Sequence, residues 1–277
     1  MTDTTNRPAL APASEEAVQS RLPKAFGTWG LLLFYLVLFG AWEVIVPLLG
    51  VKAYVLPVPT AIVRSLYVGL TSGTFVADLG ITFFELMAGY ALAVVTGLVI
   101  GALIAEFRFF ERAVYPLVVA LQSVPKIALA PLLLIWFGFG LQSKIIMAAL
   151  VAFFPMLVNT VNGLRAYDAD MYELFLSLKA SRWQQLRYLK LPAAIPFLIA
   201  GLDVSFVLAL LGAIVGEFVG ASKGLGYTVL QLQFTLDTAG VFAILVILGL
   251  IGVAGHTIIS GLGKRAAFWQ AANIGRR

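Results

Sequence analysis

Long apolar runs separated by short polar segments dominate the chain. Six runs approach the ~20 apolar residues that a helix needs to cross the hydrocarbon core of a bilayer. None of them alternates between apolar and polar positions with period two, so the pattern predicts helices rather than membrane-spanning strands. The fold class that follows is an all-α integral membrane protein with about six transmembrane helices. The predicted spans are Trp29–Leu49, Ile81–Ile104, Ala113–Phe137, Ile145–Val161, Ala193–Val215 and Val241–Ile259.

Composition agrees with a membrane location. Hydrophobic residues make up 61% of the 277 positions and charged residues only 12%, against about 25% charged residues in a typical soluble domain. The mean hydropathy is +0.96. A soluble fold of this composition would expose large apolar patches that drive association. Because the chain has no cysteine and a single histidine, His256, we expect no disulfide, no thiol catalysis and no metal site.

Lysine and arginine residues set the predicted orientation, since cytoplasmic loops carry an excess of them. Most of the 19 Lys and Arg residues fall on one side if the N-terminus is cytoplasmic. We therefore expect both termini to be cytoplasmic. Residues 1–26 are polar and lack the apolar segment of a signal peptide, so we expect a disordered cytoplasmic tail there. Residues 27–265 then form the transmembrane domain, with a long inner loop at 165–191, and 266–277 form a second cytoplasmic tail.

The inner loop 165–191 carries its own helix signals. Asp170 with Glu173 three residues later predicts a capping pair at the start of one short helix. Ser181 with Gln184 repeats this pattern and predicts the start of a second helix. The loop is therefore expected to form two short helices.

The first of these helices has an apolar face. Leu174 and Leu178 lie four residues apart and so share one side, with Phe175 beside them. An apolar face on a short, charged cytoplasmic loop needs a partner, and a groove in a soluble protein would provide one. Pro192 is expected to end the second helix or to kink it into the fifth span.

The same loop resembles the EAA signature of ABC importer permeases, whose usual form is Glu-Ala-Ala, three residues, Gly, nine residues and Ile-x-Leu-Pro. Glu173, Lys179 and the run Leu189–Pro192 stand at the matching positions. Further ordered matches to the nitrate, sulfonate and taurine branch extend the resemblance over roughly Pro57–Gly263. They are SVPKIALAPLL from Ser123 to Leu133, WFGFG from Trp136 to Gly140, Phe154 with Pro155, Gly216–Phe218, and GLGY from Gly224 to Tyr227.

The resemblance implies the type I ABC importer permease fold and a loop that docks on an ATPase subunit. Lys179 replaces the usual glycine, and because lysine adopts positive φ only at a cost, we expect a more regular bend here. A local role, in which Glu173 only caps its helix and Arg182 and Arg187 only enforce orientation, stays open. The ATPase-coupling residues implied are Glu173, Leu174, Phe175, Leu178, Lys179, Ser181 and Arg182, of which Leu174 and Phe175 replace the two alanines.

Ionisable residues inside spans indicate the translocation path, because a charge at mid-membrane needs a partner or water. Lys126 and Asp203 fall near the middle of their spans. We predict that Lys126 lines the path and favours an anionic solute. The alternative for Lys126 is an ion pair with Asp203 or Glu85 that only fixes helix packing. The alternative for Glu217 is a structural or gating role instead of a place along the path. The predicted path residues are Gln122, Ser123, Lys126, Asp203 and Glu217.

Glycine and proline positions add local expectations. Gly97 and Gly101, four residues apart in the second span, predict the close approach of another helix. Prolines inside spans predict breaks or kinks that neighbouring protein or water can satisfy. The outer segment Gly50–Gly80 contains a predicted surface helix at Thr60–Leu70.

No G-x-x-x-x-G-K-[ST] phosphate loop occurs in the sequence. We therefore expect a non-catalytic subunit without a cofactor of its own, with ATP and Mg²⁺ bound by a partner ATPase. The resemblance implies a second copy of the permease, two ATP-binding subunits at the cytoplasmic face and a periplasmic solute-binding protein, all at the bacterial inner membrane. Nucleic acid is not an expected partner.

The sequence leaves alternatives open for the identity of the solute and for the class of protein. A sulfonate, taurine, an aromatic carboxylate or nitrate is the first expectation, and a pyrimidine or riboflavin-like vitamin precursor is the second. A secondary transporter without an ATPase would more often show internal repeats. An intramembrane enzyme would need a catalytic constellation, and a structural scaffold would not need charges at mid-membrane.

Overall fold

The computed structural model describes residues 28–266, which fall into two compact units. The first unit ends at Lys52 and contains one described helix, α2 (Thr28–Leu48). This helix is apolar along its length, and most of its described side chains are exposed, which suits a helix surrounded by lipid. The tail expected at 1–26 lies outside the described residues, as does the tail expected at 266–277 apart from its first residue.

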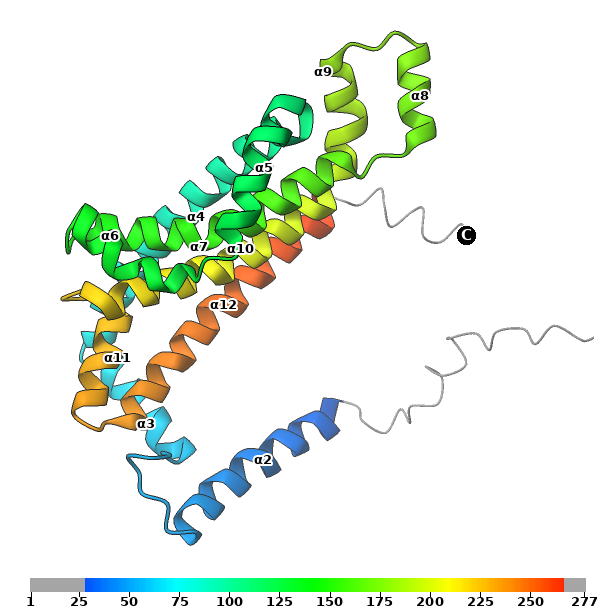
Figure 1. The fold of residues 1–277 in the computed structure, drawn as a ribbon. Helices are drawn as coiled ribbons and strands as arrows, with labels where there is room; N and C mark the ends of the chain where they lie inside the picture. The colour runs from blue at the N-terminus through cyan, green and yellow to red at the C-terminus, as the bar shows by residue number, and fades with distance from the viewer. Residues whose placement is uncertain (1–27, 267–277) are drawn as a thin grey trace, which may run out of the picture. The chain divides into compact units, whose positions relative to one another are not determined.

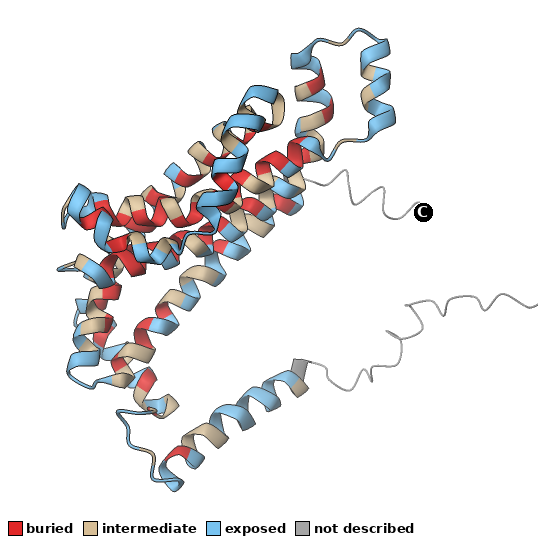
Figure 2. Cartoon of the chain, viewed as in Figure 1, coloured by how far each residue is buried: buried red, intermediate tan, exposed pale blue. Residues whose placement is uncertain are grey.

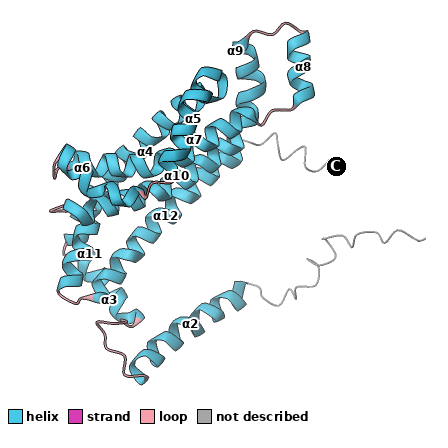
Figure 3. Cartoon of the chain, viewed as in Figure 1, coloured by secondary structure: helices cyan, strands magenta, loops and turns pink. Residues whose placement is uncertain are grey.

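The second unit is built from helices alone within its described residues (Figures 1 and 3). The surface helix expected at Thr60–Leu70 is confirmed by α3, and a helix that the sequence did not predict, α11, follows the fifth span. The elements are α3 (Pro59–Thr71), α4 (Thr74–Glu106), α5 (Arg108–Gln122), the 3₁₀ helix η1 (Lys126–Leu129), α6 (Ala130–Phe137), α7 (Leu141–Arg165), α8 (Ala169–Ser177), α9 (Arg182–Gln185), the π-helical turn η2 (Leu186–Lys190), α10 (Leu191–Gly220), α11 (Leu225–Phe234) and α12 (Thr238–Ala266).

Five helices of the described chain are long and apolar enough to cross a membrane, and a bent pair brings the number to six. The expectation of about six spans is therefore confirmed. The third span is not the continuous helix that the sequence predicted, because α5 and the η1–α6 segment meet at an angle of 91°. Pro125, with φ −64° and ψ 96°, lies at the bend in extended backbone. Proline has no N–H to donate, which removes one helical hydrogen bond and favours a break at this position.

The core of the second unit surrounds α7, which packs between α4 and α10 (Figure 2). Small residues permit this packing. A methyl group added at Gly97 of α4 would lie 2.9 Å from Cβ of Met156, and one added at Gly101 would lie 2.7 Å from Cβ of Thr160. The predicted close approach at Gly97 and Gly101 is therefore confirmed, with α7 as the partner.

The fifth span begins earlier than the sequence predicted. Residues Arg182–Gly220 form one apolar helical stretch of 39 residues, because α9, η2 and α10 follow one another without a break. Pro192 neither ends this helix nor bends it enough to separate the segments. The π-helical turn immediately before it shifts the hydrogen-bond register, which accommodates a residue that lacks an N–H.

Candidate functional site

The loop 165–191 forms a helical hairpin, α8 and α9, that projects from the end of the bundle (Figure 1). No residue of α8 is buried. Leu174 is 49% exposed and Leu178 is 71% exposed, whereas Phe175 is half-buried. The hairpin therefore presents an apolar surface that the described chain leaves uncovered, as the sequence predicted.

The two ends of the hairpin are capped in different ways. Ser181 accepts a hydrogen bond from the Gln184 N–H at 3.3 Å, and Oε1 of Gln184 accepts one from the Ser181 N–H at 2.7 Å. This capping box confirms the predicted start of the second helix. The first cap was predicted two residues too late. Asp168, not Asp170, accepts from the Met171 N–H at 3.0 Å, and Asp170 lies in the first turn, where its charge still favours a helix N-terminus.

The bend between the two helices contains Lys179 with a φ of 52°, so the expectation of a more regular bend is wrong. The N–H of Lys179 bonds the Leu176 carbonyl, and the N–H of Ala180 bonds the Phe175 carbonyl, each at 2.9 Å. This pair of bonds is the Schellman motif, which requires a left-handed residue after the helix. The lysine thus keeps the conformation for which the family signature uses glycine.

The base of the hairpin is tied to the ends of α4 and α5 by two ion pairs that the sequence did not reveal. Arg165 donates to the Ile104 carbonyl at 3.1 Å and pairs with Glu111 at 3.0 Å. Lys190 holds both oxygens of Glu106 at 2.7 and 2.8 Å, and both side chains are largely buried. No local pattern links these partners, because up to 84 residues separate them. The hairpin is therefore anchored at its base and free at its tip.

Lys126 lies at the break of the third span. Its ammonium donates to the Gln122 carbonyl at 3.3 Å and lies 4.7 Å from the centroid of the Phe154 ring. Gln122 and Ser123 are exposed beside it. Within residues 28–266, Lys126 forms no ion pair, so the alternative of a pair with Asp203 or Glu85 is wrong. The bend in the chain places the Lys126 side chain against Phe154 of α7 instead.

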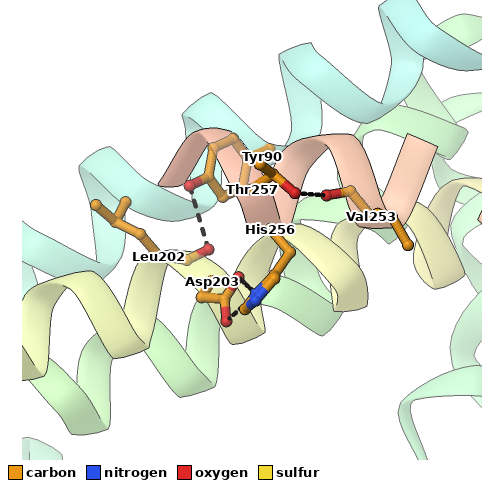
Figure 4. A network of polar contacts seen from close by, with 6 residues as sticks. All are labelled: Tyr90, Leu202, Asp203, Val253, His256 and Thr257. Atoms are coloured by element: carbon orange, nitrogen blue, oxygen red, sulfur yellow. Dashed lines mark hydrogen bonds and ion pairs between the residues drawn. The ribbon is translucent and has the colours of Figure 1, made fainter. Parts of the chain in front are cut away.

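Asp203 of α10 pairs instead with His256 of α12 (Figure 4). Nδ1 of His256 lies 2.8 and 2.9 Å from the two carboxylate oxygens. The side chains are 59% exposed for His256 and 28% exposed for Asp203. On the neighbouring side of α10, the Tyr90 hydroxyl donates to the Leu202 carbonyl at 3.2 Å. The sequence placed His256 near the end of its span but gave no sign of this partner.

Glu217 is buried at 1% exposure near the opposite end of α10 from the hairpin. One carboxylate oxygen accepts from the Thr82 hydroxyl at 2.6 Å, and the other accepts from the Gly226 N–H. The Thr82 oxygen in turn accepts from the Leu225 N–H at 2.8 Å. Glu217 thus satisfies backbone groups at the start of α11, which favours the structural alternative for this residue.

Asp78 completes the capping of α11. Its carboxylate accepts from the Gly224 N–H at 2.9 Å and from the Thr228 hydroxyl at 2.5 Å. The first N–H groups of a helix have no partner within the helix and attract negative charge. Asp78 of α4 and Glu217 of α10 supply the hydrogen-bond acceptors and the negative charge at the start of α11. These contacts fasten α4, α10 and α11 together at this end.

Lys144 of α7 joins the same end of the bundle. Although the sequence assigned it to an outer loop, it is only 2% exposed. Its ammonium donates to the carbonyls of Phe139 at 2.5 Å, Gly140 at 3.1 Å and Gly220 at 2.7 Å. The side chain therefore satisfies the carbonyls where α6 and α10 end. We call Asp78, Thr82, Lys144 and Glu217 the outer knot.

The apolar spans, the broken third span and the projecting hairpin together define a multi-pass membrane permease. The family model of the binding-protein-dependent transport system inner membrane component matches residues 93–267, and the chain belongs to this family. It is thus the permease subunit of an ABC importer with the type I fold.

Curated relatives agree over most of the chain. The formylaminopyrimidine transport permease protein ThiX of Halalkalibacterium halodurans is 37% identical over 86% of this chain and 94% of its own. The riboflavin transport system permease protein RibX of Chloroflexus aurantiacus is 35% identical over 88% and 91%. The putative aliphatic sulfonates transport permease protein SsuC of Bacillus subtilis is 34% identical over 95% of both chains.

Solved structures support the fold. One described as the MetNI methionine ABC transporter in inward facing conformations matches with a TM-score of 0.56 and 23% identity, covering 67% of this chain and 94% of its own. A second, described as an amino acid ABC transporter with histidines, matches with a TM-score of 0.61 and 18% identity, covering 72% and 97%. At these identities the likeness establishes the architecture.

Proposed function

We propose that two copies of this permease enclose one path and move a small organic anion from the periplasm to the cytoplasm of a bacterium. In this proposal the chain lies in the inner membrane with both termini cytoplasmic. It binds no nucleotide itself, and two ATPase subunits at the cytoplasmic face bind ATP and Mg²⁺. A periplasmic binding protein delivers the solute at the opposite face.

The observation that carries the proposal is the hairpin. Its tip exposes Leu174 and Leu178, while Arg165 and Lys190 fix its base to the bundle. An exposed apolar helix of this kind fits a groove of a soluble subunit. The second hairpin helix continues into α10 as one helical stretch over Arg182–Gly220. A displacement of the hairpin by the ATPase would therefore move α10 as a lever.

The residues proposed to contact the ATPase are those of the tip and the second cap. Leu174, Leu178 and the half-buried Phe175 supply the apolar face. The backbone conformation at Lys179 and the capping box at Ser181 hold the two helices in their relative orientation. The proposed coupling set is Glu173, Leu174, Phe175, Leu178, Lys179, Ser181 and Arg182.

The proposed solute is an anion such as a sulfonate, taurine, an aromatic carboxylate or nitrate. Lys126, a cation without an ion-pair partner among the described residues, stands beside exposed Gln122 and Ser123 at the break of the third span. Broken helices at mid-membrane are common features of solute paths. The relative named for aliphatic sulfonates also supports this solute class.

A pyrimidine or riboflavin-like vitamin precursor is the second candidate. Two relatives, at 37% and 35% identity, are named for the transport of formylaminopyrimidine and of riboflavin. Direct binding measurements with the purified solute-binding protein, using taurine, benzoate, formylaminopyrimidine and riboflavin as probes, separate the two candidates.

The coupling proposal is tested by co-purification with the ATPase. We expect the wild-type permease to retain the ATPase in detergent and to stimulate ATP hydrolysis in liposomes. Leu178→Glu places a charge at the tip of the hairpin and is expected to abolish both, while the permease itself stays folded. Phe234→Glu, at an 84% exposed position of α11, is the matched control and is expected to retain the ATPase. Retention of the ATPase by Leu178→Glu at the wild-type level overturns the docking role.

A further inference from the structure

Two contacts fix the register of α10 against α7 around mid-membrane. The Ser205 hydroxyl donates to the Ala152 carbonyl at 2.9 Å. Four residues earlier, Gly201 packs against Asn159, where an added methyl group would lie 2.8 Å from Cβ. The helices run antiparallel, so Phe154 of α7 lies between these contacts, at the level of Val204 of α10. Lys126, which stands over the Phe154 ring, therefore lies at nearly the same depth as Asp203.

One strip of α10 stays uncovered at this depth. Val204, Val207 and Leu211 are 47%, 50% and 45% exposed. Their spacing of three and four residues places them on one side of the helix, since each residue advances the helix by 100°. We call these three residues the open strip.

The flanks of the open strip differ in chemistry. On one side, Leu208 and Val215 of α10 pack with Ala130 and Leu133 of α6, the helix that η1 and Lys126 directly precede. On the other side, Asp203 meets His256 of α12. The open strip therefore has Lys126 on one flank and the Asp203–His256 pair on the other, and these residues lie at nearly the same depth in the membrane.

The opposite side of the α10–α12 contact is apolar. A groove of about 570 Å³ lies there, lined by side chains such as Phe83, Leu202, Phe206 and Leu262. Hydrocarbon can cover this groove at no electrostatic cost. It cannot cover the side that exposes Asp203 and His256, because ionisable side chains that face lipid at this depth are expensive. The open strip is consequently the side of α10 that faces water.

The pair leaves one ring atom of His256 available. Nδ1 is held between the two oxygens of Asp203, whereas Nε2 has no hydrogen-bond partner in the part of the chain that the structure describes (Figure 4). A carboxylate at one nitrogen fixes the ring orientation and favours a proton there. Nε2 is therefore the ring atom that can hydrogen-bond a polar group from outside the pair, and no carboxylate of the described chain other than Asp203 engages the ring.

We propose that His256, oriented by Asp203, contacts the solute in the translocation path through Nε2. It forms with Lys126 a single polar level that selects the solute, in which Lys126 donates to acceptor groups and Nε2 hydrogen-bonds a further polar group. The acceptors would be the oxygens of a carboxylate, a sulfonate or a ring carbonyl. His256 is a specificity-determining residue in this account, and Asp203 is a positioning residue. The inference rests on the proposed function, since it requires that the path runs along α10.

The first test measures uptake by the complete transporter in liposomes, with radiolabelled taurine, formylaminopyrimidine and riboflavin as probes. His256→Leu is expected to raise KM roughly tenfold while basal ATP hydrolysis and assembly stay at the wild-type level, because one hydrogen bond to the solute is lost. His256→Gln keeps an N–H donor and is expected to restore most of the affinity. Asp203→Asn is expected to raise KM without changing the amount of folded protein. Thr257→Val, which removes a hydroxyl bonded only to its own helix, is the control and should leave KM unchanged.

An unchanged KM for His256→Leu in a normally assembled complex overturns the inference. If the wild-type complex takes up none of the three probes, the proposed solute class is wrong, and the assignment of the path is then decided by a second experiment that needs no solute.

The second test uses the absence of cysteine in the natural sequence. Single-cysteine variants Val204→Cys and His256→Cys, in the assembled complex, are exposed to a charged, membrane-impermeant thiol reagent. We expect both to be labelled, with rates that change when ATP is added, because both face the path. Leu262→Cys, in the apolar groove and 61% exposed, is the matched control and is expected to stay unlabelled. Equal labelling of position 262, or none at positions 204 and 256 with or without ATP, contradicts the inference.

Discussion

The two ends of the bundle are built in opposite ways. In the outer knot, buried polar side chains from α4, α7 and α10 satisfy backbone groups of α6, α10 and α11. At the other end, α8 has no buried residue, and two ion pairs fasten the base of the hairpin to the bundle. The comparison indicates that the helix ends at the outer knot are fixed to one another, while the tip of the hairpin at the other end is left uncovered.

The outer knot is also the more costly end to disturb, because its polar groups are away from water. A buried polar group that loses its partner costs the full desolvation of that group, whereas an exposed one is resolvated. Substitutions at the outer knot are therefore expected to affect stability, and substitutions in the hairpin are expected to affect coupling.

The largest effect is expected for Lys144→Met. This change leaves three carbonyls without their donor and removes the positive charge beside Glu217, so a loss of about 3–5 kcal/mol is expected, as for a broken buried ion pair. Thermal unfolding of the purified permease in detergent measures it. Lys126→Met, which removes a partly exposed cation, serves as the control. A melting temperature for Lys144→Met equal to that of the control would show that the outer knot does not hold this end together.

A smaller effect is expected for Glu217→Gln. The amide can still accept from Thr82 with its oxygen, but its NH₂ group faces the Gly226 N–H, so one donor meets another. The cost of one unsatisfied buried group is about 1–3 kcal/mol. The same unfolding assay detects it, and uptake measured below the melting temperature should be retained. Retained stability together with lost uptake would instead assign Glu217 to the path, as the sequence first suggested.

Lys190→Met tests the base of the hairpin. The variant releases Glu106 and loosens the link between the end of α4 and the start of α10. We expect a cost of about 1–3 kcal/mol and, more characteristically, ATP hydrolysis that continues with reduced solute uptake. The ratio of ATP hydrolysed to solute transported in liposomes measures this uncoupling. A normal ratio would mean that the base of the hairpin need not be rigid.

The smallest effect is expected for Lys179→Gly. Lysine at a φ of 52° is strained by about 1–2 kcal/mol, and glycine relieves this strain but has more freedom in the unfolded chain. A net stabilisation of about 0.5–1 kcal/mol is expected, with unchanged ATPase binding. A destabilised Lys179→Gly permease would show that the lysine side chain makes a contact that outweighs its backbone strain.

Sequence patterns predicted the elements whose signals are local. Apolar length gave the spans, Ser181 with Gln184 gave the second cap, and Gly97 with Gly101 gave the close contact of α4 with α7. The bend of the third span was missed because Pro125, Pro131, Pro155 and Pro196 all lie inside predicted spans and give the same local signal. Of these four, only Pro125 accompanies a sharp bend. The left-handed bend at Lys179 was missed because the surrounding hydrogen bonds outweigh the preference of a single residue.

The site residues that were missed depend on contacts between distant segments. Lys144 looked like a loop residue, and only the fold shows that it reaches carbonyls of two other helix ends. His256 with Asp203, and Lys190 with Glu106, are 53 and 84 residues apart. Charge and depth in the membrane identified Asp203 as a residue that needs a partner, but several partners were equally compatible with the sequence.

The central claim is that the tip of the hairpin transmits the action of an ATPase to α10. The most direct measurement is cross-linking of a single-cysteine Leu178→Cys permease to the ATPase subunit in the assembled transporter, followed by an uptake assay. We predict that position 178 cross-links in high yield and that the cross-linked complex no longer transports solute. The account is contradicted if position 178 yields no cross-link while Phe234→Cys, on α11, does so with the same ATPase.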